Sequence, residues 1–230
     1  MGVNEIPSLF RLIKMNIGIG ITTTPNREAI FKESLKYLKK YTKVANLYIH
    51  NDTSYRGVAY SKNMCFYNLR FNTYNFVFDD DCFPISSDWL DYMIDCFDYT
   101  GENHFLFLND KMHQPIESNK HVGIKTYKEC GGVFLAYTSK ALNEIGYMDS
   151  EYSGWGFEHA GWSNRIHKAG LNSAPYLMPE KLTTMLRALD YEGNIESSVS
   201  DIAKRKGFEN NIKVFQREMN EQPTYKKFKR

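Results

Sequence analysis

Three consecutive acids follow an apolar segment near the middle of the chain. Residues Phe76–Phe78 predict the end of a buried strand, and Asp79, Asp80 and Asp81 follow directly. Neighbouring like charges repel each other and are costly to bury, so this cluster predicts a bound cation. The carboxyl ends of strands in an α/β sheet are also where ligands bind. Hard oxygen ligands with open positions suit Mg²⁺ or Mn²⁺ already chelated by a substrate diphosphate, rather than a closed structural metal site.

A second segment whose residues could take part in a reaction is Gly154–His159. Two glycines flank Trp155 there, and the next predicted helix opens with Glu158 and His159. Either of the last two side chains is able to accept a proton from a reacting hydroxyl. A helix N-terminus disfavours the imidazolium form, so we expect His159 to be neutral near pH 7.

The elements before the acids alternate between strand and helix. A short strand at residues 16–21 precedes a helix that begins at Thr24 and Pro25, a second strand covers residues 46–50, and a second helix covers residues 57–69. Each strand ends in a polar loop. This pattern predicts a parallel sheet with right-handed crossovers and a binding crevice at its carboxyl edge.

The pattern continues after the acids. Ser87 and Asp88 predict the start of another helix, and Gly170 the end of the helix that Glu158 opens. The other elements expected are strands near residues 105–108, 133–137 and 174–177, and helices from residue 139 and over 202–219.

A chain of 230 residues suffices for one α/β domain with a sizeable core. We expect a mostly parallel central sheet with flanking helices in a single domain at residues 16–190, an N-terminal extension at 1–15, and a C-terminal helical extension with a basic tail at 191–230.

This order of features resembles the nucleotide-sugar glycosyltransferases of the GT-A fold, especially the family-2-like group, over roughly residues 16–170. Phe78–Asp81 resembles the D-x-D motif, and Gly154–His159 resembles the G-W-G-x-E-D motif. The resemblance implies a Rossmann-like GT-A domain and a hexosyl- or pentosyltransferase. Such an enzyme moves a sugar from a nucleoside-diphosphate sugar, here a UDP-sugar by preference, to an acceptor hydroxyl with Mn²⁺ or Mg²⁺ as cofactor.

The resemblance also implies roles for individual residues on the donor side. Asp81 is the expected direct metal ligand, and Asp79 is expected to contact the metal or the ribose. Asp80 is counted with the donor-binding residues, and it is expected to face away from the metal or to orient its neighbours. The nucleotide is expected to lie against Thr22, Thr24, Asn26, Arg27, Asp52 and Lys62. Taken singly, each of these residues is as readily a cap, a turn former or a solvated charge.

Sugar and acceptor contacts are expected from four residues of the two glycine-containing segments. Trp155 would offer an aromatic platform to a sugar face, and adjacent glycines would let the backbone approach the donor sugar closely. The four residues are Gly131, Gly132, Trp155 and Gly156.

The chain departs from the family pattern at the proton acceptor. The G-W-G-x-E-D motif ends in Asp, where this chain has His159, so the base is either Glu158 or His159. Metal-dependent relatives often add a downstream His, but no His follows His167. The other metal ligands would then be water, diphosphate oxygens or Asp190.

Three alternatives stay open at this point. The acids could simply cap the following turn. Haloacid-dehalogenase-type phosphatases also have D-x-D at a strand end, but on their first strand and with Thr or Val where this chain has Phe83. A non-catalytic GT-A-like module that binds nucleotide or carbohydrate is the stronger rival, because His159 replaces the usual Asp.

Charge and cysteine content bear on partners and location. A net charge of +2 is too small to predict nucleic-acid binding by itself. The basic C-terminal tail is expected to be solvated or to touch phosphates. Four cysteines without a C-x-x-C pair, no membrane span and no signal-peptide core together predict a cytoplasmic protein with free thiols. The acceptor stays open among a saccharide, a lipid-linked saccharide, a protein and a modified nucleic acid.

Overall fold

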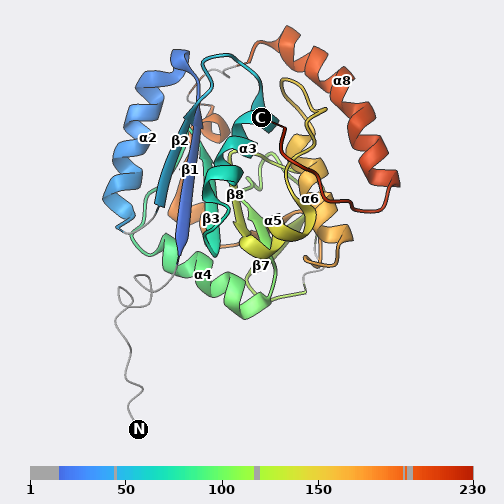
Figure 1. Cartoon of the computed structure of the whole chain (residues 1–230). Helices are drawn as coiled ribbons and strands as arrows, with labels where there is room; N and C mark the ends of the chain where they lie inside the picture. Colours follow the sequence, from blue (N-terminus) through green and yellow to red (C-terminus); the bar gives the residue numbers. More distant parts are fainter. Residues whose placement is uncertain (1–15, 44–45, 117–119, 194, 196–198, 230) are drawn as a thin grey trace.

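Five strands form the central sheet, in the order β2-β1-β3-β8-β5 (Figure 1). The computed structural model describes residues 16–43, 46–116, 120–193, 195 and 199–229, so the expected N-terminal extension lies outside the described residues. β1 pairs in parallel with β2 and β3, whereas β8 runs antiparallel between β3 and β5. The expected mostly parallel α/β sheet is confirmed, with one reversed strand. The bounds are β1 Ile17–Thr23, β2 Asn46–Asn51, β3 Tyr74–Asp79, β5 His104–Leu106 and β8 Phe134–Thr138.

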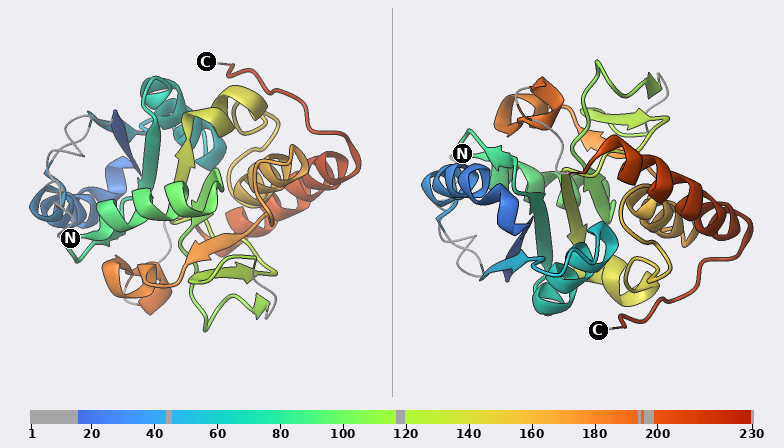
Figure 2. Two further views of the ribbon diagram at one scale, coloured as in Figure 1. Left: turned by 90° about the horizontal axis from the view of Figure 1, so that it is seen from below. Right: turned by 90° about the horizontal axis from the view of Figure 1, so that it is seen from above.

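Helices cover both faces of this sheet (Figure 2). On one face lie α3 (Val58–Leu69) and α5 (Ser139–Ile145), and on the other lie α2 (Glu28–Tyr41) and α4 (Trp89–Thr100). Beyond the sheet, α6 packs against the long helix α8. The remaining helical segments are α6 Glu158–Lys168, α7 Leu182–Met185, α8 Asp201–Asn220 and the 3-10 turns Pro25–Arg27 and Asp190–Glu192.

Aromatic rings fill the core on both faces of the sheet. Phe76 and Phe78 of β3 lie edge-on to Trp89 of α4, with ring centroids 5.2 and 5.6 Å apart. On the opposite face, Phe66 of α3 contacts Tyr137 of β8. All five rings are buried. Much of the aromatic content of the chain therefore builds the core that holds β3 in place.

Two small sheets that the sequence did not predict bring later segments back to the acids. β4 (Cys82–Pro84) pairs antiparallel with β10 (Leu186–Ala188), and the next backbone N–H, of Leu189, donates to the Asp81 carbonyl at 3.0 Å. The other sheet has the order β6-β7-β9, with β6 Pro115–Ile116, β7 Ile124–Tyr127 and β9 Leu177–Pro179. β9 begins where the expected strand at residues 174–177 ends, and residues 107–108 fall outside β5. The pairing of β4 with β10 places Asp190 close to the acid cluster.

Part of the basic C-terminal segment is docked on the body, at residues 226 and 228, while the side chains of Lys227 and Lys229 are exposed as expected for a solvated tail. The Lys226 N–H donates to the Ile145 carbonyl at 3.1 Å, and the Tyr147 N–H donates to the Lys226 carbonyl at 3.0 Å. Lys226 Nζ lies 2.8 Å from the Asp149 carboxylate, and the Phe228 ring stacks on Tyr147. Backbone pairing and ring stacking together hold the segment, and its first lysine is paired with an acid.

All four cysteines, Cys65, Cys82, Cys96 and Cys130, are free thiols, as expected. In the part of the chain that the structure describes, no helix has both the length and the apolar character needed to cross a bilayer. The division of the chain at residues 190 and 191 stays a prediction.

Candidate active site

The carboxyl ends of β1 and β3 place Asp79 next to Thr22 and Lys62. The parallel register pairs Thr22 with Asp79, and Thr22 Oγ1 donates to Asp79 Oδ1 at 2.8 Å. Lys62 of α3 places Nζ 2.5 Å from the same oxygen. The Lys62 side chain is fully buried, whereas 32% of the Asp79 side chain is exposed. Asp79 is therefore accessible to a ligand, while a buried cation offsets its charge.

Asp80 and Asp81 share the buried guanidinium of Arg27. Asp80 Oδ1 accepts from Arg27 Nε (3.1 Å) and Nη2 (2.9 Å), and Asp80 Oδ2 accepts from Thr23 Oγ1 (2.8 Å). Arg27 Nη2 also donates to Asp81 Oδ2 at 2.7 Å. Asp80 thus binds both Arg27 and Thr23, and its expected role in orienting its neighbours stays a prediction. The Arg27 guanidinium is engaged by Asp80 and Asp81, and its expected place beside the nucleotide base also stays a prediction.

Asp81 carries an orphaned oxygen. Its Oδ1 is buried and has no hydrogen-bond partner among the described residues. Burial and the charges of Asp79 and Asp80 raise the pKa of Asp81 to about 7, although Arg27 opposes the shift. Asp190 lies near enough to add to the repulsion. A cation at this oxygen would relieve both the desolvation and the repulsion.

The start of α6 lies within electrostatic range of the acid cluster. Burial raises the pKa of Glu158 to about 7, and the charge of Asp79 adds to the shift, while backbone N–H groups and Lys62 oppose it. His159 Nδ1 lies 3.4 Å from Glu158 Oε1, and His159 Nε2 is buried without a partner among the described residues. Burial, and next the charge of Lys62, hold the pKa of His159 well below its usual value. His159 is therefore neutral near pH 7, chiefly because it is buried.

Gly131 and Gly132 make room for two side chains of the protein itself. A Cβ on Gly132 would lie 2.1 Å from His159 Nδ1, and a Cβ on Gly131 would lie 2.3 Å from the Tyr191 hydroxyl. The Tyr191 hydroxyl donates to the Phe107 carbonyl at 3.1 Å. Contact of the two glycines with a donor sugar stays a prediction. In the structure they admit His159 and Tyr191 to the site.

Three of the expected nucleotide contacts lie outside this network. Thr24 Oγ1 donates to Asn26 Oδ1 at 2.7 Å in the turn after β1. Asp52 is buried, and its Oδ2 accepts from the Gly57 N–H (3.0 Å) and Ser61 Oγ (3.3 Å). Asp52 therefore shapes the turn that leads into α3. The contact of these three residues with a nucleotide stays a prediction.

Residues 153–157, which we call the G-W-G loop, precede Glu158 and are held from two sides. At the start of α3, Gly57 bridges to Gly154, and the Val58 N–H donates to the Gly154 carbonyl at 2.9 Å. Trp155 is 39% exposed, with Lys204 Nζ of α8 5.8 Å from the centroid of its ring. Its role as a platform for a sugar stays a prediction.

Two residues of α8 that hold the other side of the loop were missed by sequence reasoning. Gly207 approaches the Trp155 backbone, and Asn211 hydrogen-bonds to loop carbonyls. The available signal was a glycine inside a predicted helix, where glycine is unfavourable. Such a glycine indicates a close approach but does not identify what approaches it.

Few side chains of the candidate site are available to bind a divalent cation. Among the residues that the structure describes, no group of three or more His, Cys, Asp or Glu side chains is placed to hold a metal ion. Mg²⁺ often binds through one or two carboxylates together with substrate phosphates. Asp79, which is partly accessible, and Asp81, with its orphaned oxygen, fit a cation that is shared with a diphosphate in this way.

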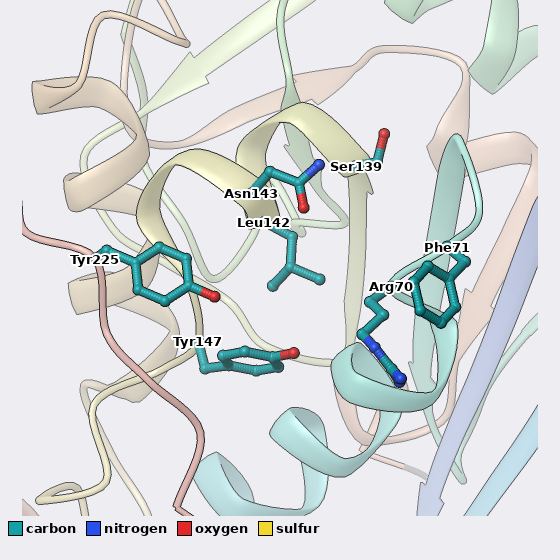
Figure 3. Close-up of a pocket in the computed structure, with 7 residues that line it drawn as sticks. All are labelled: Arg70, Phe71, Ser139, Leu142, Asn143, Tyr147 and Tyr225. Carbon is teal, nitrogen blue, oxygen red and sulfur yellow. The ribbon is translucent and has the colours of Figure 1, made fainter.

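A cavity of 410 Å³ lies elsewhere in the molecule (Figure 3). Ser139 in its wall follows β8 at the end where Thr138 pairs with Tyr74, the first residue of β3. The acids begin at Asp79, the last residue of β3, so the cavity is at the opposite end of the sheet and is separate from the candidate site. The cavity is lined by Arg70, Phe71, Ser139, Leu142, Asn143, Tyr147 and Tyr225.

Comparison with known proteins identifies the fold. No protein-family model and no curated protein matches the sequence. The catalytic domain of Drosophila β1,4-galactosyltransferase 7, in complex with xylobiose, is similar with a TM-score of 0.51 and 15% identity, over 84% of this chain and 79% of that chain. The mannosyltransferase PcManGT from Pyrobaculum calidifontis, in complex with GDP-Man and Mn²⁺, has a TM-score of 0.51 and 10% identity, over 75% of this chain and 60% of that chain. The chain therefore has a GT-A-like fold, as its motifs predicted, while membership of the family-2-like group stays a prediction.

Proposed function

We propose that this protein is a metal-dependent glycosyltransferase that moves a sugar from a nucleoside-diphosphate sugar, with UDP-sugars as the first donors to test, to an acceptor hydroxyl. The observation that carries the proposal is that Asp79, at the end of β3, lies within electrostatic range of both Asp81 and Glu158, the first residue of α6. The first two fit a cation on a leaving diphosphate, and the third fits a proton acceptor. The two similar structures are themselves glycosyltransferases, one of them with a nucleotide sugar and Mn²⁺, which supports this choice.

The diphosphate would lie against Asp79 and Asp81. Mg²⁺ or Mn²⁺ held there would act as a Lewis acid on the leaving group. Lys62 orients Asp79, and Arg27 orients Asp80 and Asp81, so the acids are in place before a ligand arrives. The nucleoside would extend along the ends of β1 and β2, past Thr22, Thr24, Asn26 and Asp52.

Glu158 is the proposed base. A carboxyl with a pKa of about 7 is half ionised near neutral pH, which suits a group that must take a proton there. The acceptor oxygen would bond to the anomeric carbon as the bond from that carbon to the diphosphate oxygen breaks, and the hydroxyl proton would pass to Glu158. His159 packs on Gly132 with its Nε2 buried, so we assign it to orienting Glu158.

A non-catalytic nucleotide- or carbohydrate-binding module is the second candidate. The observation that favours it is that both residues available as the base are largely buried, with 4% of the Glu158 side chain and 11% of the His159 side chain exposed. The two candidates share the donor site and differ in whether the donor is cleaved.

Release of nucleoside diphosphate separates the two candidates. The protein is incubated with Mn²⁺ or Mg²⁺ and a panel of nucleotide sugars, with and without simple saccharide acceptors, and donor binding is measured by calorimetry in parallel. We expect metal-dependent release of nucleoside diphosphate, at least slowly with water as the acceptor of the sugar. In Glu158→Gln we expect this release to be lost and donor binding to be retained. Glu209→Gln, on the exposed face of α8, is the matched control. Donor binding without release from any donor would support the binding module instead.

A further inference from the structure

Asn211 of α8 hydrogen-bonds to most of the G-W-G loop. Its Nδ2 donates to the carbonyls of Ser153 (3.0 Å), Trp155 (3.3 Å) and Gly156 (2.9 Å), and its Oδ1 accepts from the Ser153 N–H (3.0 Å). Asn211 has no exposed surface. The bond to the Gly156 carbonyl is buried and the other three are partly buried. A buried backbone group is costly to leave unpaired, and four bonds from one side chain fix the loop at three residues, so Asn211 holds the conformation of the loop.

Gly207, one helical turn before Asn211, lets α8 approach the loop. A Cβ at this position would lie 2.3 Å from the Trp155 carbonyl oxygen. Glycine is a poor helix former inside a helix, and φ at Gly207 is not in the left-handed region that favours glycine. The contact with Trp155 therefore accounts for this glycine, whereas helix geometry does not.

The residue directly before Glu158 is also held by α8. Phe157 has a left-handed φ of +69°, which is uncommon for a residue with a side chain. Its ring packs against Phe208 (4.7 Å between centroids) and Phe215 (5.0 Å) of α8. Such a conformation persists when the surroundings fix it, and here α8 supplies the surroundings.

We propose that Asn211 and Gly207 are positioning residues, through which α8 sets the G-W-G loop so that Trp155 and Glu158 face the acceptor together. The role given to Glu158 rests on the proposed function, whereas the holding of the loop by α8 does not. Trp155 lies in the middle of the held loop and Glu158 directly follows the loop, so a shift of the loop changes where the acceptor sits relative to its base. A misplacement of about 1 Å can cost about 100-fold in rate.

Tryptophan fluorescence reports on the loop without any assay of activity. Trp89 and Trp162 have no exposed surface, and Trp155 is 39% exposed, so quenching by acrylamide reports mainly on Trp155. Asn211→Ala and Gly207→Ala are compared with Asn210→Ala, which removes the same type of side chain from the exposed face of the same helix. We expect the quenching constant to change about twofold in the first two variants, as the ring leaves its place, and to stay unchanged in the third.

Kinetics then test what the loop positions. In Asn211→Ala and Gly207→Ala we expect kcat to fall about tenfold or more, with the dissociation constant of the donor within about twofold of wild type, because the donor acids lie on other elements. Wild-type quenching and wild-type kcat in both variants would overturn the proposal. Altered quenching in a protein that transfers no sugar to any acceptor would uphold the holding of the loop and refute the proposed function. Should Asn211→Ala fail to fold, Gly207→Ala still decides, because alanine favours the helix that it sits in.

Discussion

Lys62 Nζ lies 2.5 Å from Asp79 Oδ1, which joins a fully buried lysine to the partly exposed first acid of the cluster. A buried ammonium group needs a counter-charge, and Asp79 supplies it at the end of β3. Lys62 also opposes the raised pKa of Glu158 and helps to lower the pKa of His159. One cation therefore influences the charge of both motifs of the candidate site.

Replacing this lysine should weaken the fold and change the charge of the site. Lys62→Met keeps the volume of the side chain but leaves Asp79 without its cation. Because Asp79 is one-third exposed, we expect a loss of about 1–3 kcal/mol in the free energy of unfolding, less than for a fully buried pair. Urea denaturation measures this loss. Lys32→Met, which breaks an exposed pair with Glu28, is the control and should leave stability close to that of wild type, because water screens an exposed pair. Equal effects of the two variants would contradict the pairing.

Arg27 makes a sharper prediction, because its partners are more deeply buried. Arg27→Gln leaves Asp80 and Asp81 without their shared cation, and breaking such a buried pair costs about 3–5 kcal/mol. Adding Asp80→Asn to the same chain should restore part of that loss, because it removes one unpaired charge. Chemical denaturation of the single and double variants measures both steps. Arg187→Gln, in an exposed pair with Glu192, is the control. No recovery in the double variant would contradict the assignment.

The raised pKa of Asp81 predicts how stability depends on pH. The folded value of about 7 lies above the ordinary 3.8, so between these pH values the folded protein binds more protons than the unfolded chain. The free energy of unfolding therefore falls as the pH rises through this window. Asp81→Asn removes the charge and should be about 1–3 kcal/mol more stable than wild type at pH 8, with no difference near pH 4. Thermal unfolding across the window measures this. A variant that is less stable than wild type at pH 8 would refute it.

Glu158 predicts the pH dependence of transfer. A base with a pKa of about 7 must be deprotonated to act, so kcat/KM should rise with pH, reach half its maximum near pH 7 and then level off. Glu158→Gln should lose the activity along with this ascending limb. His159→Gln should keep an ascending limb, because His159 is already neutral across the range. An unchanged profile in Glu158→Gln would remove Glu158 from the mechanism.

Local patterns were enough to predict the elements that carry the chemistry. Apolar runs that end in polar residues marked the ends of β1, β2 and β3, and the glycines before Glu158 marked the loop that opens α6. These signals are local because the alternation of strand and helix, and the capping of each element, are set by neighbours in the chain. The GT-A-like fold follows from their order.

The contacts between distant segments were not predictable in the same way. Periodicity indicates which side of a segment is buried, but it does not identify the partner. The sequence of residues 134–138 does not indicate that β8 pairs antiparallel with β3 and β5 and lies between them. Likewise Arg27 and Asp80 are 53 residues apart, and Asn211 and Gly156 are 55 apart, so their pairing depends on the assembled fold.

Gly132 and His159 provide a test of packing within the site that needs no substrate. A methyl group on Gly132 would overlap the imidazole, since the three atoms nearest to the new Cβ all belong to His159, at 2.1, 2.3 and 3.0 Å. Overpacking of this kind usually costs about 1–3 kcal/mol, so Gly132→Ala should lower the free energy of unfolding by about that much. His159→Ala removes the ring, and the double variant should recover most of the loss caused by the added methyl. Urea denaturation of the wild type, the two single variants and the double variant measures the coupling energy. Gly101→Ala is not a suitable control, because Gly101 has a left-handed φ of +70°. If Gly132→Ala costs the same with and without the imidazole, His159 does not occupy the space above Gly132, and its assignment to orienting Glu158 fails with it.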